Sequence, residues 1–344
     1  MRLLPRPPRL HLKSTPLSRK YTTESTPFNP QSYLSSALQK FRATPPRRIP
    51  ATLTPDPSVR LSQALDPTRT RSTPPPPSTL PQGHHMVYFE PLLSQEERMP
   101  DGTNVSHWPG GPFVRRMWAG GSVTFRNDHP HAEPELDGKS GMVCVERIKS
   151  EKDEDVRLQI NESDPEKDKV FVDLERDYLL LDGSRKVIIE EKRKLVFMRE
   201  RRKPSSTQQT TPAPVKEVIA PWKPDVRYAL HPTRDLLKTF SDLTNNAHLI
   251  HLDREYAQKQ EGYRDVLVQG PLTLVLMLEA LSKQGIVREI EYRNLSPLFV
   301  NEKFEVCLKR KDAESGAKKE QNWIVWIEGP GGRLAVKGRG VTCV

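Results

Sequence analysis

The sequence lacks the features that define several classes of protein. Its 344 residues include only three cysteines, Cys144, Cys307 and Cys343, and none of them belongs to a CxxC pair. Three scattered cysteines provide neither a disulfide framework nor a zinc site, and they suit a reducing compartment. No run approaches the roughly 20 apolar residues that cross a bilayer, so we expect no membrane insertion. An apolar signal-peptide core of about 7–15 residues is also absent, which argues against secretion.

The excess of positive charge is confined to the N-terminal part of the chain. The net charge is +10, from 54 Lys and Arg against 44 Asp and Glu. Residues 1–85 hold 13 of these bases and 3 of the acids, so the remaining residues carry 41 of each sign. A nucleic-acid-binding protein needs basic side chains on its folded surface, where they displace counterions from phosphates. We therefore expect no nucleic-acid partner.

The first 23 residues have the composition of a mitochondrial transit peptide. They contain six basic residues and no acid, with Ser and Thr between them. This composition favours import into the mitochondrial matrix. A disordered basic tail is the alternative, because prolines at positions 5, 7, 8 and 16 interrupt the helix that such peptides form.

Proline is concentrated in residues 1–85, which hold 17 of the 33 prolines. Such a composition buries little apolar surface. We therefore interpret residues 1–85 as a transit peptide followed by a proline-rich disordered segment. Only Thr54–Leu65 has the pattern of a short helix, and order is expected to begin near His85.

Residues 86–202 have the pattern of a β-rich N-terminal domain. Segments rich in Val, Ile, Leu, Phe and Tyr are flanked by charged residues or alternate with them, as in half-buried strands. Asp182-Gly183 is typical of a hairpin turn between the last two segments. The expected strands are Ser122–Arg126, Gly141–Ile148, Lys169–Leu180 and Lys186–Met198. Residues 203–232 are expected to be a linker, since most of this stretch is rich in Pro, Ser and Thr.

Residues 233–344 form a second predicted domain with a different order of elements. Helices are expected over Thr233–Leu243 and Arg254–Gln258, and Asp253 is suited to cap the second. Leu272–Leu281 is apolar on nearly every side, which indicates a helix that is buried on all faces. A proline just before it is tolerated in a first helical turn.

Four strands are expected after the apolar helix. They are Val287–Tyr292, Lys303–Lys309, Asn322–Glu328 and Arg333–Val341. Trp323 and Trp326 lie in one of them and face opposite sides, so at most one should belong to the core. One buried helix followed by an antiparallel sheet predicts an α+β fold.

A recognisable motif runs from Phe240 to Leu272. It reads Leu-Thr-Asn-Asn-Ala-His-Leu-Ile-His-Leu-Asp over residues 243–253, followed by Gln269-Gly270-Pro271-Leu272. This resembles the hydratase motif of the MaoC-like hot-dog enzymes, which is Leu-Thr-Gly-Asp-x-Asn-Pro-x-His-x-Asp followed by His-Gly-x-Leu. The resemblance implies a hot-dog fold, in which an antiparallel sheet wraps around a central helix.

Upstream segments are similar to the first half of the double-hot-dog branch of this family. They are Asp101-Gly102, Pro109-Gly110-Gly111 and Arg115-Arg116-Met117-Trp118-Ala119-Gly120-Gly121. Over most of residues 86–344 the chain resembles, within that branch, the fungal mitochondrial 3-hydroxyacyl-thioester dehydratases of type 2. The resemblance implies a tandem hot-dog whose C-terminal half is catalytic and whose N-terminal half is degenerate.

Three positions depart from the motif. Its catalytic Asp falls on Asn246, its Asn on His248, and its helix-preceding His on Gln269. An Asn at the first position is part of the variant of the double-hot-dog branch. An Asn side chain accepts no proton at physiological pH, however, which keeps a non-catalytic thioester-binding protein open as an alternative.

The candidate site residues suit the removal of water from a 3-hydroxyacyl thioester. His251 is expected to transfer the proton, because imidazole titrates nearest neutral pH. Asn246 is expected to bind the hydroxyl or the attacking water, and His248 to share the proton transfer. The N–H of Gly270, with Gln269 beside it, is expected to bind the thioester oxygen at a helix N-terminus. This mechanism needs no cofactor and no metal.

Two other groups of residues give weaker indications of function. His248 and His251 stand three residues apart, but no cluster of Cys or carboxylate accompanies them, so we predict no metal site. Arg115 and Arg116 are candidates for contact with a phosphate, and a plain surface role is equally open.

The preferred function is reversible dehydration of (3R)-hydroxyacyl thioesters to trans-2-enoyl thioesters in mitochondrial fatty acid synthesis. A hydratase of a short branched dicarboxylyl-CoA, such as mesaconyl- or itaconyl-CoA, is the alternative of the same fold. The expected partner is the acyl thioester substrate, carried by CoA or by an acyl-carrier protein. Chain length, carrier and assembly into a homodimer stay open.

Overall fold

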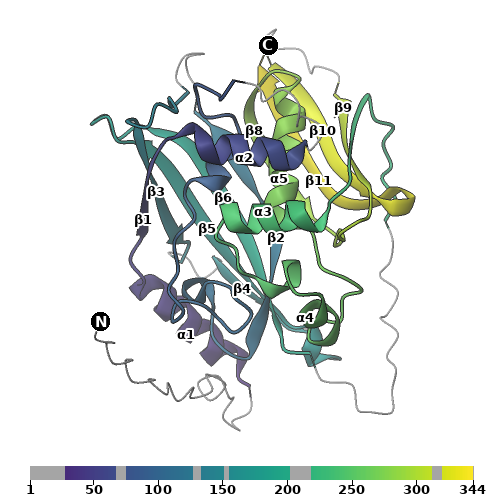
Figure 1. Cartoon of the computed structure of the whole chain (residues 1–344). Coiled ribbons are helices and arrows are strands. Elements are labelled where there is room, and N and C mark those ends of the chain that lie inside the picture. The colour runs from purple at the N-terminus through teal and green to yellow at the C-terminus, as the bar shows by residue number, and fades with distance from the viewer. Residues whose placement is uncertain are drawn as a thin grey trace, which may run out of the picture.

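A computed structural model gives the fold of residues 28–66, 75–126, 133–150, 155–201, 218–311 and 320–343. The strands of these residues form one antiparallel sheet with the order β1-β3-β5-β6-β2-β8-β11-β10-β9-β7, and β4 pairs with β5 beside this path. The sheet curves around the helix α5, and the helices α2 and α3 lie across its open side (Figure 1).

The sheet consists of two halves with the same strand order. The N-terminal half contains β1 (Arg47–Thr52), β2 (Phe113–Phe125), β3 (Gly141–Ile148), β4 (Val156–Gln159), β5 (Lys169–Leu180) and β6 (Val187–Arg199). The C-terminal half contains β7 (Val226–Leu230), β8 (Ile286–Asn294), β9 (Phe304–Arg310), β10 (Glu320–Gly329) and β11 (Arg333–Cys343). Leaving β4 aside, each half runs first-third-fourth-fifth-second from its outer edge inward. The fold is therefore a double hot-dog, and the predicted α+β class is confirmed.

The two halves meet where their second strands pair. Gly120 to Thr124 of β2 lie opposite Arg293 to Glu289 of β8 in antiparallel register. A Cβ at Gly120 or Gly121 would stand about 2 Å from a backbone oxygen of a neighbouring strand. The paired glycines thus allow the close approach of the strands at the junction, where any side chain would separate them.

The central helix α5 (Gly270–Ser282) is surrounded by strands of both halves. It contacts β2 as well as β8, β9, β10 and β11. Nine of its 13 residues are buried, from Leu272 to Leu281, so the prediction of a helix buried on all faces is confirmed. Glu279, which pairs with Lys283 at 3.4 Å, lies near the partly solvated end of the helix.

Two short helices precede α5 and match their predictions. The helix α3 (Arg234–Leu243) is capped by the Thr233 hydroxyl, which accepts from the Leu236 N–H at 3.1 Å. The helix α4 (Arg254–Lys259) is capped by the Asp253 carboxylate, which accepts from the Tyr256 N–H at 3.0 Å. Between them lies the 3-10 turn η6 (Leu249–His251), which carries the histidines of the motif.

The prediction that residues 1–85 are disordered is wrong for residues 75–85, where Leu80 is buried and Thr79 pairs with Glu135, and for residues 28–66. This segment forms α1 (Pro30–Ala43), β1 and α2 (Pro55–Leu65), and its apolar side chains enter the core, with Phe41 2 % and Leu61 0 % exposed. Its prolines stand where structure tolerates them. Pro30 and Pro55 begin helices, and Pro50 lies in an edge strand. The N-terminal half therefore begins well before residue 86, and the predicted transit peptide lies outside the described residues.

The predicted linker, residues 203–232, also contains part of the fold. β7 is the outer strand of the C-terminal half and pairs with β9. Just before it, Ala220 and Trp222 pack against Trp326 on the outer face of the sheet, and the rings of the two tryptophans lie 5.3 Å apart. Both Trp323 and Trp326 are consequently buried, so the expectation that at most one belongs to the core is wrong.

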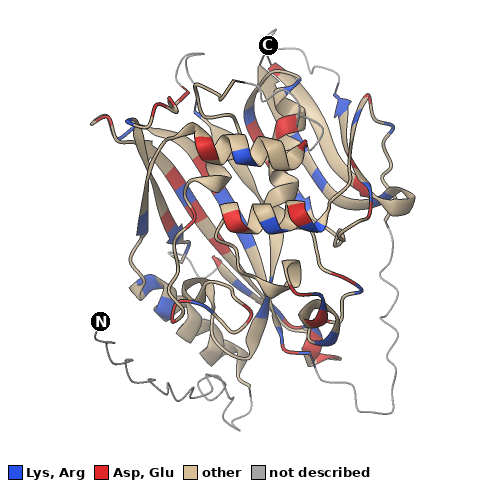
Figure 2. Ribbon diagram, in the orientation of Figure 1, with Lys and Arg blue, Asp and Glu red and all other residues tan. Residues whose placement is uncertain are grey.

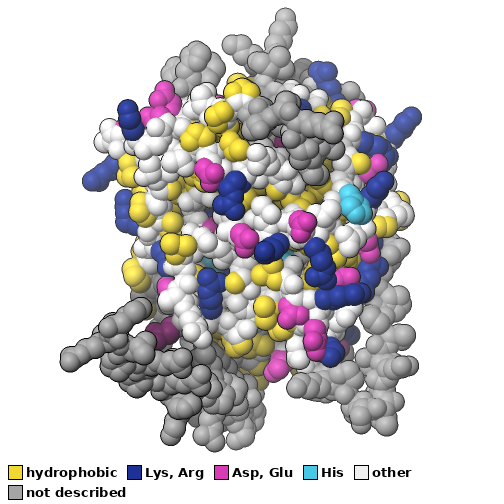
Figure 3. All heavy atoms as spheres, viewed as in Figure 1, with side chains coloured by type: hydrophobic (Ala, Val, Ile, Leu, Met, Phe, Trp, Pro, Cys, Tyr) yellow, Lys and Arg dark blue, Asp and Glu magenta, His cyan; other side chains and the backbone are white. Residues whose placement is uncertain are grey.

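The other predicted strands and the Asp182-Gly183 turn agree with the structure, although β2 begins nine residues before the predicted strand. The charged residues of α2 and α3 are exposed, whereas α5 behind these helices is nearly free of charge (Figure 2). Basic and acidic side chains are interspersed on the face shown in Figure 3, and neither sign gathers into a patch. Among the described residues, no helix combines the length and apolar character that a membrane crossing requires.

Candidate active site

A cavity of about 510 Å³ lies at the junction of the two halves. The C-terminal half contributes the motif residues and the first turn of α5, and the N-terminal half contributes β2, β5, β6 and the loop after Met99. Its polar lining includes Asn104, Arg116, Asn246, His248, His251 and Asn294. Four of the five predicted site residues therefore line one cavity; they are His251, His248, Asn246 and Gly270.

His251 is held in a defined orientation at the end of η6. Its Nδ1 lies 2.8 Å from the carbonyl oxygen of Leu267, so Nδ1 carries the proton and donates it to that oxygen. The lone pair of the neutral ring is then on Nε2. Burial is the main reason that the pKa of His251 is lowered to about 4, and the nearby Arg116 guanidinium acts in the same direction. The ring is consequently a neutral proton acceptor at physiological pH.

His248 stands next to His251, with 5.4 Å between the ring centroids and the rings almost perpendicular. Its Nε2 lies 3.4 Å from Oδ2 of Asp101, a residue of the N-terminal half. Burial, together with His251 and Arg116, holds the pKa of His248 well below its ordinary value. The cavity thus presents two neutral imidazoles side by side.

Asn246 lies in the same loop and also lines the cavity. Its Oδ1 accepts the backbone N–H of His248 at 3.2 Å. This contact fixes the carboxamide, so the Nδ2 amide group is the end that remains for a ligand. Asn246 is therefore suited to donate a hydrogen bond to an oxygen, and it does not replace the proton-accepting carboxylate of the motif.

Gly270 forms the first turn of α5 at the cavity wall. A Cβ there would lie 2.9 Å from the Trp118 Cβ and 3.0 Å from Nδ2 of Asn294. Nδ2 of Asn294 in turn donates to the Trp118 carbonyl at 2.9 Å. The absence of a side chain thus lets β2 and β8 approach the helix N-terminus, whose free N–H groups and dipole favour negative charge.

Gln269 is the predicted site residue that does not line the cavity. Its side chain is fully buried and points toward α3, where Nε2 donates to the Leu237 carbonyl at 2.8 Å and to the Ser241 hydroxyl at 3.0 Å. The prediction that Gln269 is a substrate-binding residue is therefore wrong for its side chain, because these contacts tie α5 to α3 instead. A residue at a motif position has the same place in the fold as in its relatives, but a different side chain there makes different contacts.

A family model, hydroxyacyl-thioester dehydratase type 2, matches residues 83–300 of the chain. The chain belongs to this family. The match covers both halves of the cavity, including the upstream loop, β2 and the histidine loop. The membership places the protein among hydratases and dehydratases of acyl thioesters.

Individual relatives agree with the family assignment. The mesaconyl-C(4)-CoA hydratase of Chloroflexus aurantiacus is 30% identical over 228 residues, which is 64% of this chain and 72% of that protein. The mitochondrial hydroxyacyl-thioester dehydratase type 2 of Schizosaccharomyces pombe is 35% identical over 92 residues, 25% of this chain and 30% of that protein. A solved structure, the MaoC-like dehydratase of Phytophthora capsici, superposes with a TM-score of 0.58 at 14% identity, over 89% of this chain and 98% of that one, which shows a shared fold.

Sequence reasoning missed the cavity residues of the N-terminal half of this dehydratase-family protein. Asp101 and Arg116 come from segments that carry the resemblance, but nothing in the sequence shows that they face the histidine loop. Arg116 lines the cavity, and Arg115 pairs with Glu261 at 2.6 Å with both side chains about one-tenth exposed or less. A plain surface role is therefore wrong for both arginines.

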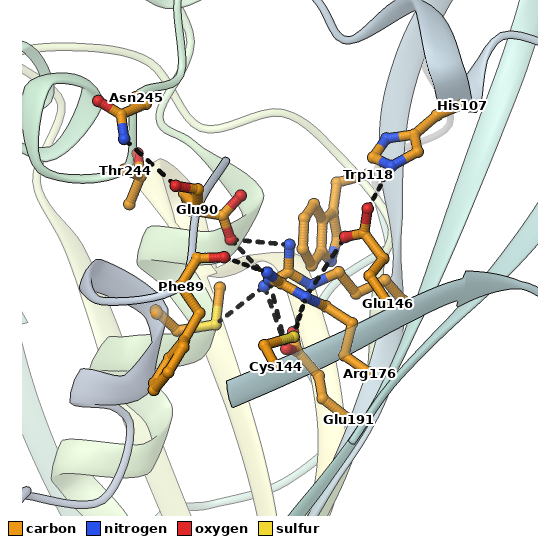
Figure 4. A network of polar contacts seen from close by, with 12 residues as sticks. Phe89, Glu90, His107, Trp118, Cys144, Glu146, Arg176, Glu191, Thr244 and Asn245 are labelled. Carbon is orange, nitrogen blue, oxygen red and sulfur yellow. Dashed lines mark hydrogen bonds and ion pairs between the residues drawn. The ribbon is translucent and has the colours of Figure 1, made fainter. Parts of the chain in front are cut away.

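Behind the cavity lies a buried network of charges (Figure 4). Arg176 is fully buried and contacts Glu90 at 2.7 Å, Glu146 at 3.3 Å and Glu191 at 4.0 Å. Arg193, which lines the cavity, contacts Glu90 at 2.9 Å and Glu191 at 2.6 Å. Burial opposes the charge of Glu191, but the two arginines outweigh it and hold the pKa of this carboxyl at about 2.

The network reaches the histidine loop through Glu90. The Glu90 carbonyl accepts from Nδ2 of Asn245 at 3.4 Å, a contact visible at the left of Figure 4. At the opposite end, Glu146 lies 2.9 Å from Nε2 of His107, whose Nδ1 lies 3.4 Å from Nη1 of Arg116. The charge network of the N-terminal half thus contacts the cavity lining at two places, Asn245 in the histidine loop and Arg116 on β2.

Within the described residues, one group of three side chains has the spacing of metal ligands, and it lies outside the cavity. It consists of Glu305, Cys307 and Glu328 on β9 and β10. Arg227 of β7 contacts the carboxylates of both Glu305 and Glu328. The two carboxylates therefore share one guanidinium in an ion-pair cluster at the sheet surface, which offsets part of their negative charge.

Proposed function

We propose that this cavity catalyses the reversible dehydration of (3R)-hydroxyacyl thioesters to trans-2-enoyl thioesters. The orientation of His251 carries the proposal. Its Nδ1–H is occupied by the Leu267 carbonyl, so a neutral Nε2 is available beside Asn246, His248 and the N-terminus of α5. His251 thus provides a proton acceptor, Asn246 a donor for the hydroxyl, and the N-terminus of α5 a site for negative charge.

The proposed steps conserve atoms and charge. Nε2 of His251 takes the proton from C2, and the electron pair moves into the thioester as an enolate at the N-terminus of α5. The C3–O bond then breaks while Asn246 holds the oxygen. The departing hydroxide takes the proton back from the His251 imidazolium and leaves as water, so the enzyme returns to its starting state. Hydration is the reverse sequence.

The proposed setting is fatty acid synthesis in the mitochondrial matrix, with the acyl group on an acyl-carrier protein or on CoA. Two observations support it. The family matches include mitochondrial hydroxyacyl-thioester dehydratases type 2 of two yeasts, and the first 23 residues have the composition of a transit peptide. Fusion of residues 1–27 to a fluorescent protein is expected to direct it to mitochondria. Replacement of Arg2, Arg6 and Arg9 by Gln is expected to prevent this, and unchanged cytosolic fluorescence of the unmodified fusion would contradict the location.

The proposed reaction is tested by hydration of crotonyl-CoA and of a longer trans-2-enoyl-CoA, followed as loss of enoyl absorbance. The wild-type protein is compared with His251→Ala and with His231→Ala, a control histidine that is exposed and outside the cavity. Turnover by the wild type and by the control, with a loss of at least about 10²-fold in His251→Ala, is expected. A folded wild type without turnover on any enoyl thioester would leave a non-catalytic thioester-binding role.

A second candidate substrate is a short branched dicarboxylyl-CoA, such as mesaconyl- or itaconyl-CoA. The observation that favours it is Arg116, a guanidinium that lines the cavity and acts electrostatically on both histidines. A free carboxylate next to the reacting double bond would be a suitable partner for this cation. The relative in Chloroflexus aurantiacus carries mesaconyl-C(4)-CoA in its name.

The two substrates are separated by kcat/KM in parallel assays with mesaconyl-CoA and with a longer enoyl-CoA. Arg116→Leu is expected to reduce kcat/KM for mesaconyl-CoA more than for the uncharged substrate if the dicarboxylyl-CoA is the natural one. Preference of the wild type for the longer chain, with equal effects of Arg116→Leu on both substrates, would support the fatty acid reaction.

A further inference from the structure

The hydratase motif of this chain has lost its carboxylate, yet a carboxylate is present at the site. Asn246 occupies the motif position of the catalytic Asp. Asp101, about 145 positions earlier in the sequence, is 6 % exposed and lies 3.4 Å from Nε2 of His248. His248 itself stands where the motif has Asn. The two substitutions in the motif thus occur together with a carboxylate supplied by the other half.

Asp101 is held so that one of its oxygens faces His248. Its Oδ1 accepts from the N–H of Thr103 at 2.9 Å and from the Thr103 hydroxyl at 2.7 Å. Oδ2 is left for His248. The backbone is fixed as well, because the Asp101 carbonyl accepts from the Leu249 N–H in the histidine loop at 2.9 Å. An anchored acid at the second nitrogen of a histidine is the arrangement by which hydrolases orient and polarise an imidazole.

We propose that Asp101 supplies, through His248, the carboxylate that the motif has lost at position 246. In this pair Asp101 is a positioning residue, because it contacts His248 and does not line the cavity. This inference rests on the hydratase function proposed above. It makes the N-terminal half part of the catalytic apparatus, whereas the sequence predicted a degenerate half without a role in the chemistry.

The chemical consequence concerns the tautomer and charge of His248. A proton on Nε2 faces the Asp101 carboxylate, so the lone pair is on Nδ1 and accepts the O–H of the substrate hydroxyl or of the attacking water. As the C3–O bond forms or breaks, positive charge develops on the paired imidazoles. Among the residues that the structure describes, the charged or titratable groups that act on these rings or contact them are the two histidines themselves, Arg116 and the carboxylate of Asp101. Asp101 therefore offsets charge that arises in the transition state more than in the bound substrate.

The test uses the full-length protein and the isosteric variant Asp101→Asn. Glu261→Gln is the matched control, since it also removes a buried carboxylate that links the two halves, through Arg115, but contacts neither histidine. Asp101→Asn is expected to lower kcat by roughly 10²-fold with little change in KM. It is also expected to move the acid limb of the pH profile to lower pH, because loss of a nearby anion disfavours the imidazolium. Glu261→Gln is expected to lower thermal stability without moving that limb.

A rescue variant separates catalysis from structure. In the Asp101→Asn background, Asn246→Asp returns a carboxylate to the motif position and is expected to restore kcat at least about tenfold. A wild-type kcat and pH profile in Asp101→Asn would overturn the inference. So would a loss that the control reproduces and Asn246→Asp does not relieve, since that pattern indicates a structural contact only.

A measurement without turnover keeps the inference separate from the proposed function. Nitrogen-15 chemical shifts of the histidine rings report which nitrogen carries the proton. Nε2–H is expected for His248 and Nδ1–H for His251, and Nδ1–H on His248 would overturn the inference whatever the activity. An inactive wild type with the expected tautomers would refute the hydratase function and leave the Asp101–His248 pair as found.

Discussion

Gly102 of the N-terminal half lies against Ala247 of the histidine loop so closely that a Cβ on Gly102 would stand 2.1 Å from the Ala247 carbonyl oxygen. The backbone of Gly102 has a φ of +85°, in the region that favours glycine. The neighbours of these two residues are Asp101 and His248, which face each other. The position of the two cavity histidines, His248 and His251, therefore depends on a glycine in the other half of the molecule.

Gly102→Ala is expected to reduce kcat at least about tenfold, because a displacement of about 1 Å in the histidine loop disturbs the alignment of reacting groups. Gly183→Ala is the matched control. Its φ of +88° gives a similar backbone strain, but no atom of the part of the chain that the structure describes lies within 4 Å of the new Cβ. Both variants are expected to lose about 1 kcal/mol of stability to backbone strain, Gly102→Ala is expected to lose more because of its clash with Ala247, and only Gly102→Ala loses activity. Equal activity of the two variants in the enoyl-CoA assay would contradict the role of this contact.

Buried histidines predict that stability falls as the medium becomes acidic. Burial lowers the pKa of His84, His85 and His251 to about 4, from an ordinary value near 6.5. Between these values the unfolded chain binds protons that the folded protein does not bind. The stability is therefore fully present above about pH 6.5 and is lost as the pH falls toward 4. Denaturant midpoints measured at pH 7 and pH 5 are expected to differ in this direction.

A single histidine separates this effect from general acid denaturation. His85 is fully buried, and neither of its ring nitrogens has a hydrogen-bond partner among the described residues. His85→Leu is expected to make the fall between pH 7 and pH 5 shallower. His231→Leu, at an exposed position, is expected to leave the slope unchanged. Equal slopes in all three proteins would show that His85 does not contribute.

The charge network predicts a large effect on stability at Arg176. Arg176→Met leaves Glu90, Glu146 and Glu191 with less compensation in a buried site. The loss of one member of a buried ion network is expected to cost about 3–5 kcal/mol. Arg339→Met removes an exposed pair with Glu291, in which the side chains are 74% and 51% exposed, and is expected to cost at most about 1 kcal/mol. Urea unfolding of both variants measures the difference, and similar losses would contradict the structural importance of the network.

The elements that the sequence predicted well are those with strong local patterns. The helix Gly270–Ser282 is apolar on nearly every side, and the predicted cap Asp253 stands directly before its helix. Such signals arise within a few residues of each other. The motif likewise brought His248, His251 and Asn246 together, because they share one short loop.

The failures have a different physical cause. Proline content suggested disorder in residues 28–66. Proline is tolerated in a first helical turn, however, because an N–H there would have no partner within the helix. An edge strand also tolerates proline, because its outer N–H groups have no neighbouring strand to bind. Arg116 reaches the cavity, and Asp101 reaches His248, only because β2 pairs with β8 and the loop before β2 folds over η6. No local pattern encodes such a long-range contact. Gln269 is the opposite case. Its position in the motif predicts a site residue, but its side chain donates hydrogen bonds to α3 instead.

Trp222 provides a test of the segment that sequence composition assigned to a linker. Its ring packs against Trp326, which is fully buried on the outer face of the sheet. Trp222→Ala is expected to destabilise the protein by about 1–3 kcal/mol through lost apolar contact, and to shift tryptophan emission to the red as Trp326 meets water. Val218→Ala, at a site that is 51% exposed, is expected to stay within about 0.5 kcal/mol of the wild type. Neither residue lines the cavity, so kcat should be unchanged in both. A Trp222→Ala protein with wild-type stability and emission would show that this segment lies on the sheet without contributing to its core.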